Sequence, residues 1–400
     1  MSKKLTLAVI GCGDFAKNFV PLFKAHPYVE KVYVCDVIRS RAEEYSQKFE
    51  VEILDSFEDA LKHPAINAVA IFAQRHLHGP LVTQALRAGK HVYSAVPMAS
   101  EVEQCHEIVE LVKETGLTYM MGETCYYYPS AMFCRSEYKK GTFGKFVYGE
   151  SQYHHDLSHF PKNYLDDKQS AGVPPFFYPT HSTAMIITAA GSYVKKVAAF
   201  GYEDQEMDGF FGKGTNQWDN LYSNSYSLMQ LANGGTARVN ECRRIGYKAP
   251  SSYVSSFYGT EAGYQFMNAQ HLLTTKTKEG VDLRDVSDFV NPEAMTLHKA
   301  DTDFKQKVAN HTWQWDDFSP IQAEERKRLP KSYEGLGNGH MASHQFLIDD
   351  FCTAAYNEKQ PEVNNAWMAA RYTVPGLIAH QSVLKGGETL NVPDFGEIGD

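Results

Sequence analysis

The chain has 400 residues, 43% hydrophobic and 22% charged, and its 39 basic and 48 acidic side chains give a net charge of −9. This balance is typical of a folded globular protein, and the length predicts two domains. The mild negative charge argues against a nucleic-acid partner. Seven scattered cysteines and the absence of an apolar stretch of roughly 20 residues predict a reduced, soluble, cytoplasmic protein without a membrane span.

Strands and helices alternate along residues 1–124. The strands are short apolar runs without polar alternation, which indicates a parallel sheet covered on both faces. The predicted fold class of this segment is therefore α/β, a doubly wound Rossmann domain. The expected strands are 5–10, 31–35, 68–73, 91–93 and 118–122, and the expected helices are 14–26, 41–49, 77–88 and 101–114.

Residues 125–400 have a different pattern. Longer strands, in which apolar and polar residues partly alternate, are expected at 145–153, 194–202, 223–232 and 235–243. Gly234-Gly235 predicts a hairpin turn between the last two. The stretches 203–220 and 276–340 are expected to be loops, and helices are expected at 342–357 and 363–385. We predict an α+β domain for substrate binding and oligomerisation, with a large open, mainly antiparallel sheet, whose terminal helices pack back on the first domain.

The sequence Gly11-Cys12-Gly13-Asp14-Phe15-Ala16 has the G-x-G-x-x-A pattern between the first predicted strand and helix. The first glycine allows the tight turn, the second admits a pyrophosphate to the backbone, and the small third residue lets helix and strand pack closely. The phosphates then lie at a helix N-terminus, which favours anions. The pattern therefore predicts a nicotinamide dinucleotide site.

Asp36 ends the second predicted strand, 23 residues beyond Gly13. An acid there accepts hydrogen bonds from ribose hydroxyls and repels a 2′-phosphate, which favours NAD over NADP. The alternative is that Asp36 only caps the next helix. Arg39 and Arg41 follow and could hold a 2′-phosphate, so NADP stays open.

Several motifs together resemble the glucose–fructose oxidoreductase and inositol dehydrogenase family (Gfo/Idh/MocA). They are Gly11–Ala16, the segment from Ala73 to His78, Ala88-Gly89-Lys90-His91-Val92, Gly144-Lys145 and Leu390-Asn391-Val392-Pro393. The resemblance implies NAD(P)-dependent dehydrogenation of sugars or related alcohols in a cleft between the domains, and a homodimer or homotetramer formed through the open sheet. With the motif it predicts these dinucleotide-binding residues: Gly11, Gly13, Asp14, Phe15, Asp36, Arg41, Ala73, His78, Ala95 and Pro97.

Two departures from that family concern catalysis. The family usually carries Glu-Lys-Pro where this chain has Ala95-Val96-Pro97, so the lysine that helps to move the proton is missing. The family also places an aspartate four residues before a histidine, and Phe177 stands there ahead of His181. The usual dehydrogenase mechanism therefore cannot be transferred unchanged.

Oxidation of a carbinol needs a base for the hydroxyl proton, and histidine titrates near neutral pH. We predict His181 as that base, with the alternative that it caps a helix. Tyr178 and Tyr127 are further candidate catalytic residues, and Tyr126 a candidate substrate-binding residue, although packing accounts for most of the 24 tyrosines.

Tyr178-Pro179-Thr180-His181 also resembles a second branch of that superfamily, the NAD-using glycosidases such as α-N-acetylgalactosaminidases. Residues Met121-Gly122-Glu123-Thr124-Cys125-Tyr126-Tyr127 are similar to the same branch. There NAD oxidises a ring hydroxyl, the aglycone is eliminated, and the sugar is reduced again. The sequence therefore leaves three hypotheses open: a dehydrogenase, an NAD-using glycosidase, and a non-catalytic dinucleotide-binding regulatory protein.

The segment from Gln152 to His159 contains three histidines and an aspartate. Neighbouring residues of a strand point to opposite faces, so His154 and His155 do not converge on a metal ion. No metal site is predicted. His155 and Asp156 are instead expected to bind a small carbohydrate substrate at the rim of the cleft.

Overall fold

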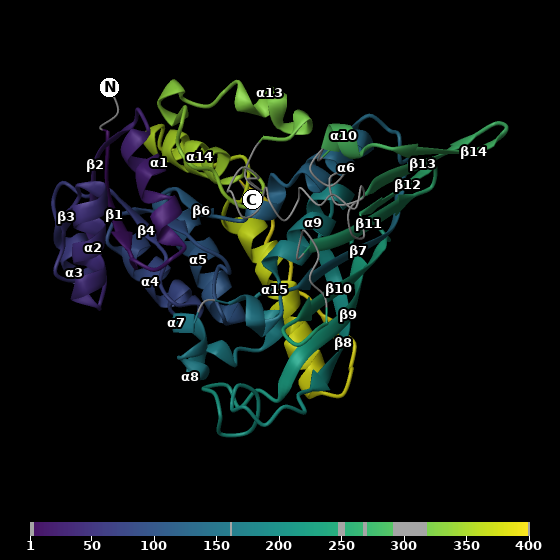
Figure 1. Ribbon diagram of the computed structural model, residues 1–400, viewed down its shortest axis with the longest axis horizontal. Coiled ribbons are helices and arrows are strands. Elements are labelled where there is room, and N and C mark those ends of the chain that lie inside the picture. Colours follow the sequence, from purple (N-terminus) through teal and green to yellow (C-terminus); the bar gives the residue numbers. More distant parts are fainter. Residues whose placement is uncertain (1–3, 161, 247–252, 267–269, 291–317, 399–400) are drawn as a thin grey trace, which may run out of the picture.

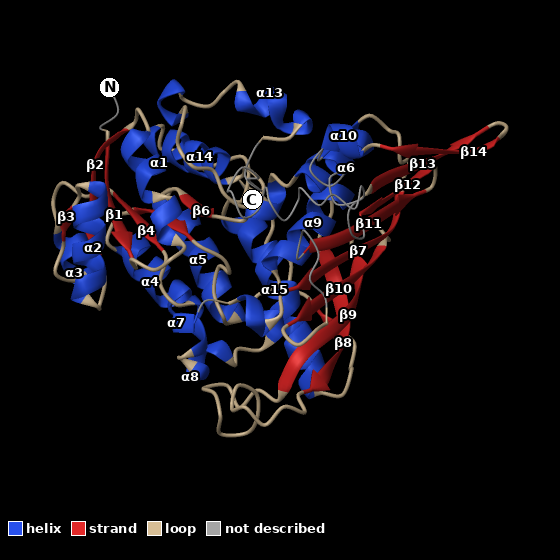
Figure 2. Ribbon diagram, in the orientation of Figure 1, coloured by secondary structure: helices blue, strands red, loops and turns tan. Residues whose placement is uncertain are grey.

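The computed structural model describes residues 4–160, 162–246, 253–266, 270–290 and 318–398, and it contains two sheets, each with helices packed against it (Figures 1 and 2). No helix within these ranges is long and apolar enough to cross a membrane. Apolar side chains form two large buried clusters, one shared by both sheets and one between the first sheet and the C-terminal segment. The predicted boundary at residue 124 falls between the last strand of the first sheet and the first strand of the second.

The first sheet is entirely parallel, with the strand order β3-β2-β1-β4-β5-β6. The order reverses between β1 and β4, and ligands of such sheets bind at the carboxyl ends of the strands beside this switch point. The predicted Rossmann architecture is confirmed. Its strands are β1 (Leu5–Ile10), β2 (Val29–Cys35), β3 (Glu52–Ile53), β4 (Ala68–Ile71), β5 (His91–Ser94) and β6 (Tyr119–Met121), and its helices are α1 (Val20–Ala25), α2 (Arg39–Phe49), α3 (Phe57–Lys62), α4 (His78–Arg87) and α5 (Val102–Thr115).

The first helix differs from the prediction of a continuous helix over 14–26. The chain forms a short 3₁₀ helix at Ala16–Asn18, and the α-helix α1 begins only at Val20. Pro21 explains the break, because proline lacks an N–H group and its ring clashes with the carbonyl four residues earlier in an α-helix. The loop after β1 is consequently longer and more open than a direct strand-to-helix turn.

The second sheet has nine strands in the order β14-β13-β12-β11-β7-β10-β9-β8-β15. Only the β7–β10 pair is parallel, so the predicted, mainly antiparallel sheet is confirmed. Its strands are β7 (Phe146–His154), β8 (Val194–Glu203), β9 (Tyr222–Leu231), β10 (Thr236–Cys242), β11 (Tyr253–Gly259), β12 (Ala262–Phe266), β13 (His271–Thr277), β14 (Gly280–Asp285) and β15 (Leu390–Asn391).

The hairpin predicted at Gly234-Gly235 joins β9 to β10, with Gly234 at φ +89°. The loop predicted at 203–220 holds no helix or strand after Glu203, which is the last residue of β8. The loop predicted over 276–340 is wrong at its start, because 276–285 completes the β13–β14 hairpin. Residues 291–317 of that stretch lie outside the described residues. Short helices lie on both sides of that segment, α10 (Ser287–Val290) before it and α13 (Ala323–Arg326) after it.

Helices cover one face of the second sheet and connect it to the first (Figure 1). The long helix α15 (Ala366–Leu384) contacts β8, α9 (Thr180–Ala190) and α5. The other terminal helix, α14 (His344–Tyr356), contacts α1 and β1, so it packs on the first sheet. The remaining helices of the middle region are α6 (Pro129–Lys139), α7 (Lys162–Leu165) and α8 (Lys168–Ala171).

Candidate active site

The loop after β1 has the geometry that a pyrophosphate needs. Gly11 has φ +95°, and a Cβ there would lie 2.7 Å from the carbonyl oxygen of Phe72, so only glycine fits. A Cβ on Gly13 would meet nothing within 4 Å, so the backbone faces open space. The N–H groups of Gly13, Asp14 and Phe15 donate no hydrogen bond to the part of the chain that the structure describes. These unpaired donors fit an anionic ligand.

Asp36 lies beside this loop at the carboxyl end of β2. Its Oδ2 accepts a hydrogen bond from the N–H of Cys12 (2.7 Å), and its Oδ1 accepts one from the N–H of Ile38 (2.7 Å). The carboxylate is therefore fixed in place and keeps lone pairs for ribose hydroxyls. Arg39 is paired with Glu43 and Asp55, which occupies one of the two cations that could have bound a 2′-phosphate.

The loops after β4 and β5 form the next part of the same edge. His78 is buried behind them, with Nδ1 2.7 Å from the carbonyl oxygen of Pro97 and Nε2 3.0 Å from that of Ala73. Both ring nitrogens face carbonyl oxygens of the protein, and the neutral ring, whose pKa is lowered by burial, donates a hydrogen bond to one of them. His78 therefore lies between the two loops, and its cofactor-binding role stays a prediction. Ala95 and Pro97 are buried at the end of β5. Arg41 lies near the first loop, where it opposes the larger effect of burial, which raises the pKa of the Cys12 thiol to about 12.

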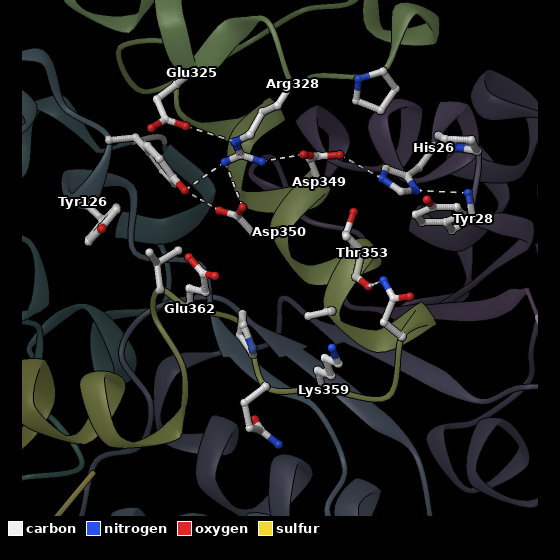
Figure 3. Close-up of a pocket in the computed structure, with 18 of the residues that line it drawn as sticks. His26, Tyr28, Tyr126, Glu325, Arg328, Asp349, Asp350, Thr353, Lys359 and Glu362 are labelled. Carbon is white, nitrogen blue, oxygen red and sulfur yellow. Dashed lines mark hydrogen bonds and ion pairs between the residues drawn. The ribbon is translucent and has the colours of Figure 1, made fainter. Parts of the chain in front are cut away.

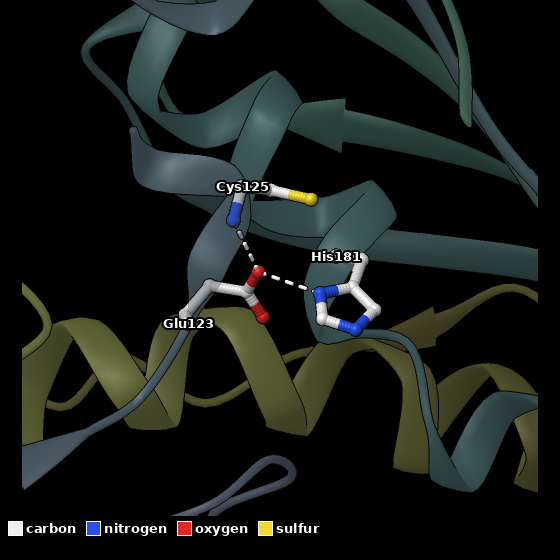
Figure 4. A group of neighbouring side chains, drawn as sticks. All are labelled: Glu123, Cys125 and His181. Carbon is white, nitrogen blue, oxygen red and sulfur yellow. Dashed lines mark hydrogen bonds and ion pairs between the residues drawn. The ribbon is translucent and has the colours of Figure 1, made fainter. Parts of the chain in front are cut away.

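A carboxylate, an imidazole and a phenol form a hydrogen-bonded chain at the carboxyl end of β6. His181 Nδ1 lies 2.7 Å from Glu123 Oε1, and His181 Nε2 lies 3.1 Å from Tyr178 Oη (Figure 4 shows the first contact). Glu123 follows β6 by two residues, and His181 lies in the first turn of α9. The carboxyl end of the parallel sheet and the start of α9 thus meet here.

The surroundings fix the direction of this chain of hydrogen bonds. Burial opposes ionisation of Glu123, but the adjacent His181 and the N–H of Cys125 outweigh it and lower the pKa of the carboxyl. An ionised Glu123 accepts a hydrogen bond from the Nδ1–H group of His181, so the neutral imidazole offers a lone pair at Nε2 to the Tyr178 hydroxyl. Tyr178 can therefore pass a proton to His181 while receiving another at its own oxygen.

Two guanidinium groups flank the Tyr178 ring. The Arg75 Cζ atom lies 4.2 Å from the ring centre, and that of Arg243 lies 5.9 Å from it. Burial raises the pKa of Tyr178 to about 12, although both arginines lower it. The free phenolate is therefore scarce near neutral pH, and proton transfer from Tyr178 requires the acceptor His181.

Cys125 completes a group of three side chains whose ligand atoms lie within 4.8 Å of one another (Figure 4). A metal would need the thiolate, but burial raises the pKa of Cys125 well above its ordinary value, and Glu123 adds to the shift. Glu123 and His181 already hydrogen-bond each other. The arrangement favours a hydrogen-bonded pair over a metal site.

A second buried carboxylic acid lies behind the first. Glu241, near the end of β10, accepts a hydrogen bond from Ser182 Oγ (2.7 Å), and its Oε2 lies 3.5 Å from Arg243 Nη2. Burial raises the pKa of Glu241 to about 8, although Arg243 and Ser182 lower it. Near neutral pH this residue is largely a neutral acid.

Tyr126 and Tyr127 are not brought to His181. Both line a separate pocket of about 1190 Å³ between α14, α6 and the start of β2 (Figure 3). The Tyr127 hydroxyl donates to Asp350 and accepts from Arg328, and the Tyr126 ring lies under Arg135. The 3₁₀ turn after Glu123 carries both rings to this other pocket, away from His181. The catalytic role of Tyr127 and the substrate role of Tyr126 stay predictions that this placement does not support.

His155 and Asp156, the two residues predicted to bind substrate, have different surroundings. Asp156 uses both carboxylate oxygens within the protein: Oδ1 accepts from the N–H and hydroxyl of Ser158, and Oδ2 accepts from the N–H of Ile245. These contacts hold the loop in place, and the substrate role of Asp156 stays a prediction. The His155 ring packs between Tyr153 and Phe160, and Tyr153 in turn contacts His181. Its substrate role stays a prediction.

His340 is a site residue that sequence reasoning missed. Its ring contacts Phe15 of the dinucleotide loop, with centroids 5.4 Å apart, and its Nδ1 lies 3.2 Å from His344 Nε2. Burial lowers the pKa of His340 to about 4, with a further contribution from His181. The three residues His340, Met341 and Ala342 have φ of +48°, +53° and +62°. Non-glycine residues in this conformation cost about 1–3 kcal/mol each and cluster at functional sites.

The fold joins a parallel sheet of the dinucleotide-binding Rossmann kind to a second sheet with its helices, and the hydrogen bond between Glu123 and His181 links the two. Residues 5–123 match the model of the oxidoreductase family with an NAD-binding Rossmann fold (GFO_IDH_MocA). This match agrees with the family resemblance that the motifs had suggested.

Relatives align with nearly the whole chain. A glycosyl hydrolase family 109 protein of Streptomyces filamentosus is 24% identical over 97% of this chain and 77% of its own length. The structure of levoglucosan dehydrogenase with NADH and levoglucosan superposes with a TM-score of 0.74 at 17% identity, covering 98% of this chain and 100% of that one. Scyllo-inositol dehydrogenase from Lactobacillus casei, with NAD(H) and scyllo-inositol, gives 0.67 at 16% identity, with 97% and 99% covered. At these identities the two structures show a shared fold.

Proposed function

We propose that the protein is an NAD-dependent oxidoreductase that oxidises a carbinol of a sugar or sugar-derived alcohol. The observation that carries the proposal is the Glu123–His181–Tyr178 chain, which ends at the same sheet edge as the dinucleotide loop. The family of residues 5–123 binds NAD. Two structures of the same fold hold NAD(H) with a sugar or an inositol, which supports both the cofactor and the substrate class.

The residues of this chain fit the cofactor. Gly11 and Gly13 leave room for the pyrophosphate, the N–H groups of Gly13 to Phe15 have no other acceptor, and Asp36 is held ready for the ribose. When bound, NAD accepts the hydride of the carbinol. Asp36, together with the engagement of Arg39 by Glu43 and Asp55, supports NAD over NADP.

Proton transfer then follows from the protein side chains. Tyr178 Oη receives the proton of the substrate hydroxyl while its own proton moves to Nε2 of His181. Glu123 keeps the opposite nitrogen protonated and stabilises the imidazolium that forms, as a carboxylate does in a nucleophile–histidine–acid triad. Tyr178 is the proposed catalytic residue that touches the substrate, and His181 and Glu123 act through it.

A second candidate, an NAD-using glycosidase that oxidises, eliminates and re-reduces its sugar, is supported by the relative from Streptomyces filamentosus. The same three residues serve either reaction, since both begin with removal of a hydroxyl proton. A non-catalytic dinucleotide-binding protein, the third reading, would have no use for a carboxylate–imidazole–phenol chain at this edge.

Purified protein without added cofactor separates these readings. Mass spectrometry of nucleotide released on denaturation is combined with product analysis on free sugars and on aryl glycosides. Empty protein that forms NADH from a free sugar supports the dehydrogenase. Stoichiometric retained NAD(H) with glycoside cleavage and no net NADH supports the glycosidase. Binding of NAD without turnover on either panel would contradict both enzymes.

The outer face of the second sheet supports a homo-oligomer. Among the described residues it exposes Phe200 (64%), Leu228 (63%) and Tyr202 (47%) on the neighbouring strands β8 and β9. Apolar side chains gathered on a two-strand surface favour burial against another subunit, and a second copy is the proposed occupant. The two-domain division at residue 124 and a cytoplasmic location are proposed with it.

A further inference from the structure

Arg75 brings a positive charge to the Tyr178 ring without a carboxylate partner in the described ranges. It belongs to the loop after β4, yet its Nη1 donates to the Tyr164 hydroxyl (2.6 Å) and its guanidinium lies against the ring of Tyr178. No carboxylate of the described ranges forms an ion pair with Arg75. Removing a cation from water without a counter-ion is costly, so the position calls for an anion.

Arg243 supplies a second cation on the other domain. Its side chain is 3% exposed, and its Cζ lies 5.2 Å from the Tyr153 ring centre and 5.9 Å from that of Tyr178. Its carboxyl neighbour is Glu241, whose Oε2 lies 3.5 Å from Arg243 Nη2. Burial raises the pKa of Glu241 to about 8. Near neutral pH Glu241 therefore cancels little of the Arg243 charge.

The balance of charge around Tyr178 is positive. Glu123 is the ionised carboxylate of the proton chain, and it lies on the His181 side, where Nδ1 occupies it. Arg75 and Arg243 lie on the ring side of Tyr178. This pair of cations at the Tyr178 ring is a local feature, because the chain as a whole has a net charge of −9.

We infer that the substrate carries an anionic group, a carboxylate or a phosphate, which Arg75 and Arg243 bind while its carbinol lies at Tyr178 Oη. The substrate class is thereby an acidic sugar or polyol. Guanidinium groups match the planar geometry of carboxylate and phosphate oxygens, which makes arginine the fitting residue for this task. The inference rests on the proposed oxidoreductase and narrows its substrate.

The test measures binding, so that it does not depend on turnover. The dissociation constants of glucose, glucuronate and glucose 6-phosphate are measured by titration of full-length protein saturated with NAD at low ionic strength. We expect at least one acidic sugar to bind about tenfold more tightly than glucose. Added salt should weaken this preference. The two acidic sugars distinguish a carboxylate from a phosphate as the recognised group.

Three variants complete the test. R75Q should abolish the preference for the acidic sugar. R75K keeps the positive charge but loses the planar, two-pronged guanidinium, so it should retain part of the preference. The control R135Q removes an arginine of similar aromatic surroundings in the separate pocket and should leave the preference intact. NAD affinity should be unchanged in all three.

Several results would overturn the inference. Equal affinities for neutral and acidic sugars would do so, as would a loss of NAD affinity in R75Q, which would assign Arg75 to the pyrophosphate. If R75Q bound all three sugars equally less tightly and had a lower Tm, Arg75 would serve to hold the two domains together. If R75Q does not fold, R75K and the salt dependence of the wild type still decide the matter. Failure of the oxidoreductase itself would appear separately, as the absence of turnover.

Discussion

His181 Nδ1 lies 2.7 Å from Glu123 Oε1, although the two residues are separated by 58 positions in the chain. The contact joins the carboxyl end of β6 in the first sheet to the first turn of α9 above the second sheet. Both partners are almost fully buried, with side-chain exposures of 3% and 0%. A pair so placed holds the imidazole in one tautomer and directs its other nitrogen at Tyr178.

Glu123→Gln tests this pairing. Glutamine keeps the size of the side chain but presents an amide that can donate to Nδ1, which favours the wrong tautomer of His181. We expect kcat to fall by about 10²–10⁴-fold. NAD affinity should not change, because Glu123 touches neither the loop after β1 nor Asp36. Steady-state kinetics with a parallel NAD titration measure both, and an unaltered kcat would remove Glu123 from the mechanism.

Tyr178→Phe removes the proposed proton-transfer oxygen and keeps the ring. The expected loss of kcat is again about 10²–10⁴-fold, with sugar binding less affected. Tyr127→Phe is the matched control, since that hydroxyl bonds Asp350 and Arg328 in the separate pocket. Comparable losses in both variants, measured at the same pH, would return Tyr127 to the site and contradict the assignment.

Removal of metal ions should leave the reaction intact. The thiol of Cys125 is kept protonated by burial, so Glu123, Cys125 and His181 act through hydrogen bonds. Exhaustive chelation should not change kcat, and Cys125→Ser should keep most of the activity. Activity lost with the chelator and restored by zinc, together with a stoichiometric metal content, would show instead that the three residues form a metal site.

Glu241 makes stability depend on pH in a defined direction. Its pKa is raised to about 8, above its ordinary value, so its protonated form favours the folded state. The contribution is fully present below the ordinary carboxyl range and is lost as the pH rises through about 8. The Tm of the wild type relative to E241Q, which still accepts the Ser182 hydrogen bond, should decrease between pH 5 and 8. A constant difference would contradict the raised pKa.

His340 should present an N–H donor to a ligand. The buried Nδ1 of His344 has no hydrogen-bond partner in the described ranges, so its proton belongs on Nε2, which donates to Nδ1 of His340. The proton of His340 is then on Nε2, away from His344. His340→Phe should lower kcat/KM about tenfold and His340→Gln by less. Equal effects of the two variants would show that only the ring packing matters.

Local patterns predicted the dinucleotide half of the molecule well. Gly11 and Gly13 are read from a short motif because the turn, the strand before it and Asp36 are set by neighbouring residues. The same local reasoning missed the β13–β14 hairpin, because every residue of β14 is exposed and no apolar alternation marks the strand. The break before Val20 is visible in Pro21, but the helical spacing of the surrounding phenylalanines concealed it.

The candidate catalytic residues could be predicted only in part. Tyr178 lies two residues before α9 and His181 lies in its first turn, so their proximity is local. Glu123 lies in the motif Met121–Tyr127, but its partner His181 lies 58 residues further along the chain. Only the folded structure, in which α9 packs against the turn after β6, shows their contact. Tyr126 and Tyr127 follow Glu123 directly, and nothing in the sequence shows that a 3₁₀ turn takes them to another pocket. His340 comes from the C-terminal segment and required the full fold.

The most direct test of the central claim follows the absorbance of the nicotinamide ring while sugars, polyols and their acidic derivatives are added to NAD-loaded protein. The proposed mechanism predicts a substrate-dependent increase of the reduced band, or glycoside cleavage with transient reduction, that disappears in Tyr178→Phe while NAD still binds. Protein that binds neither NAD nor NADP, or a Tyr178→Phe variant as active as the wild type, would contradict it.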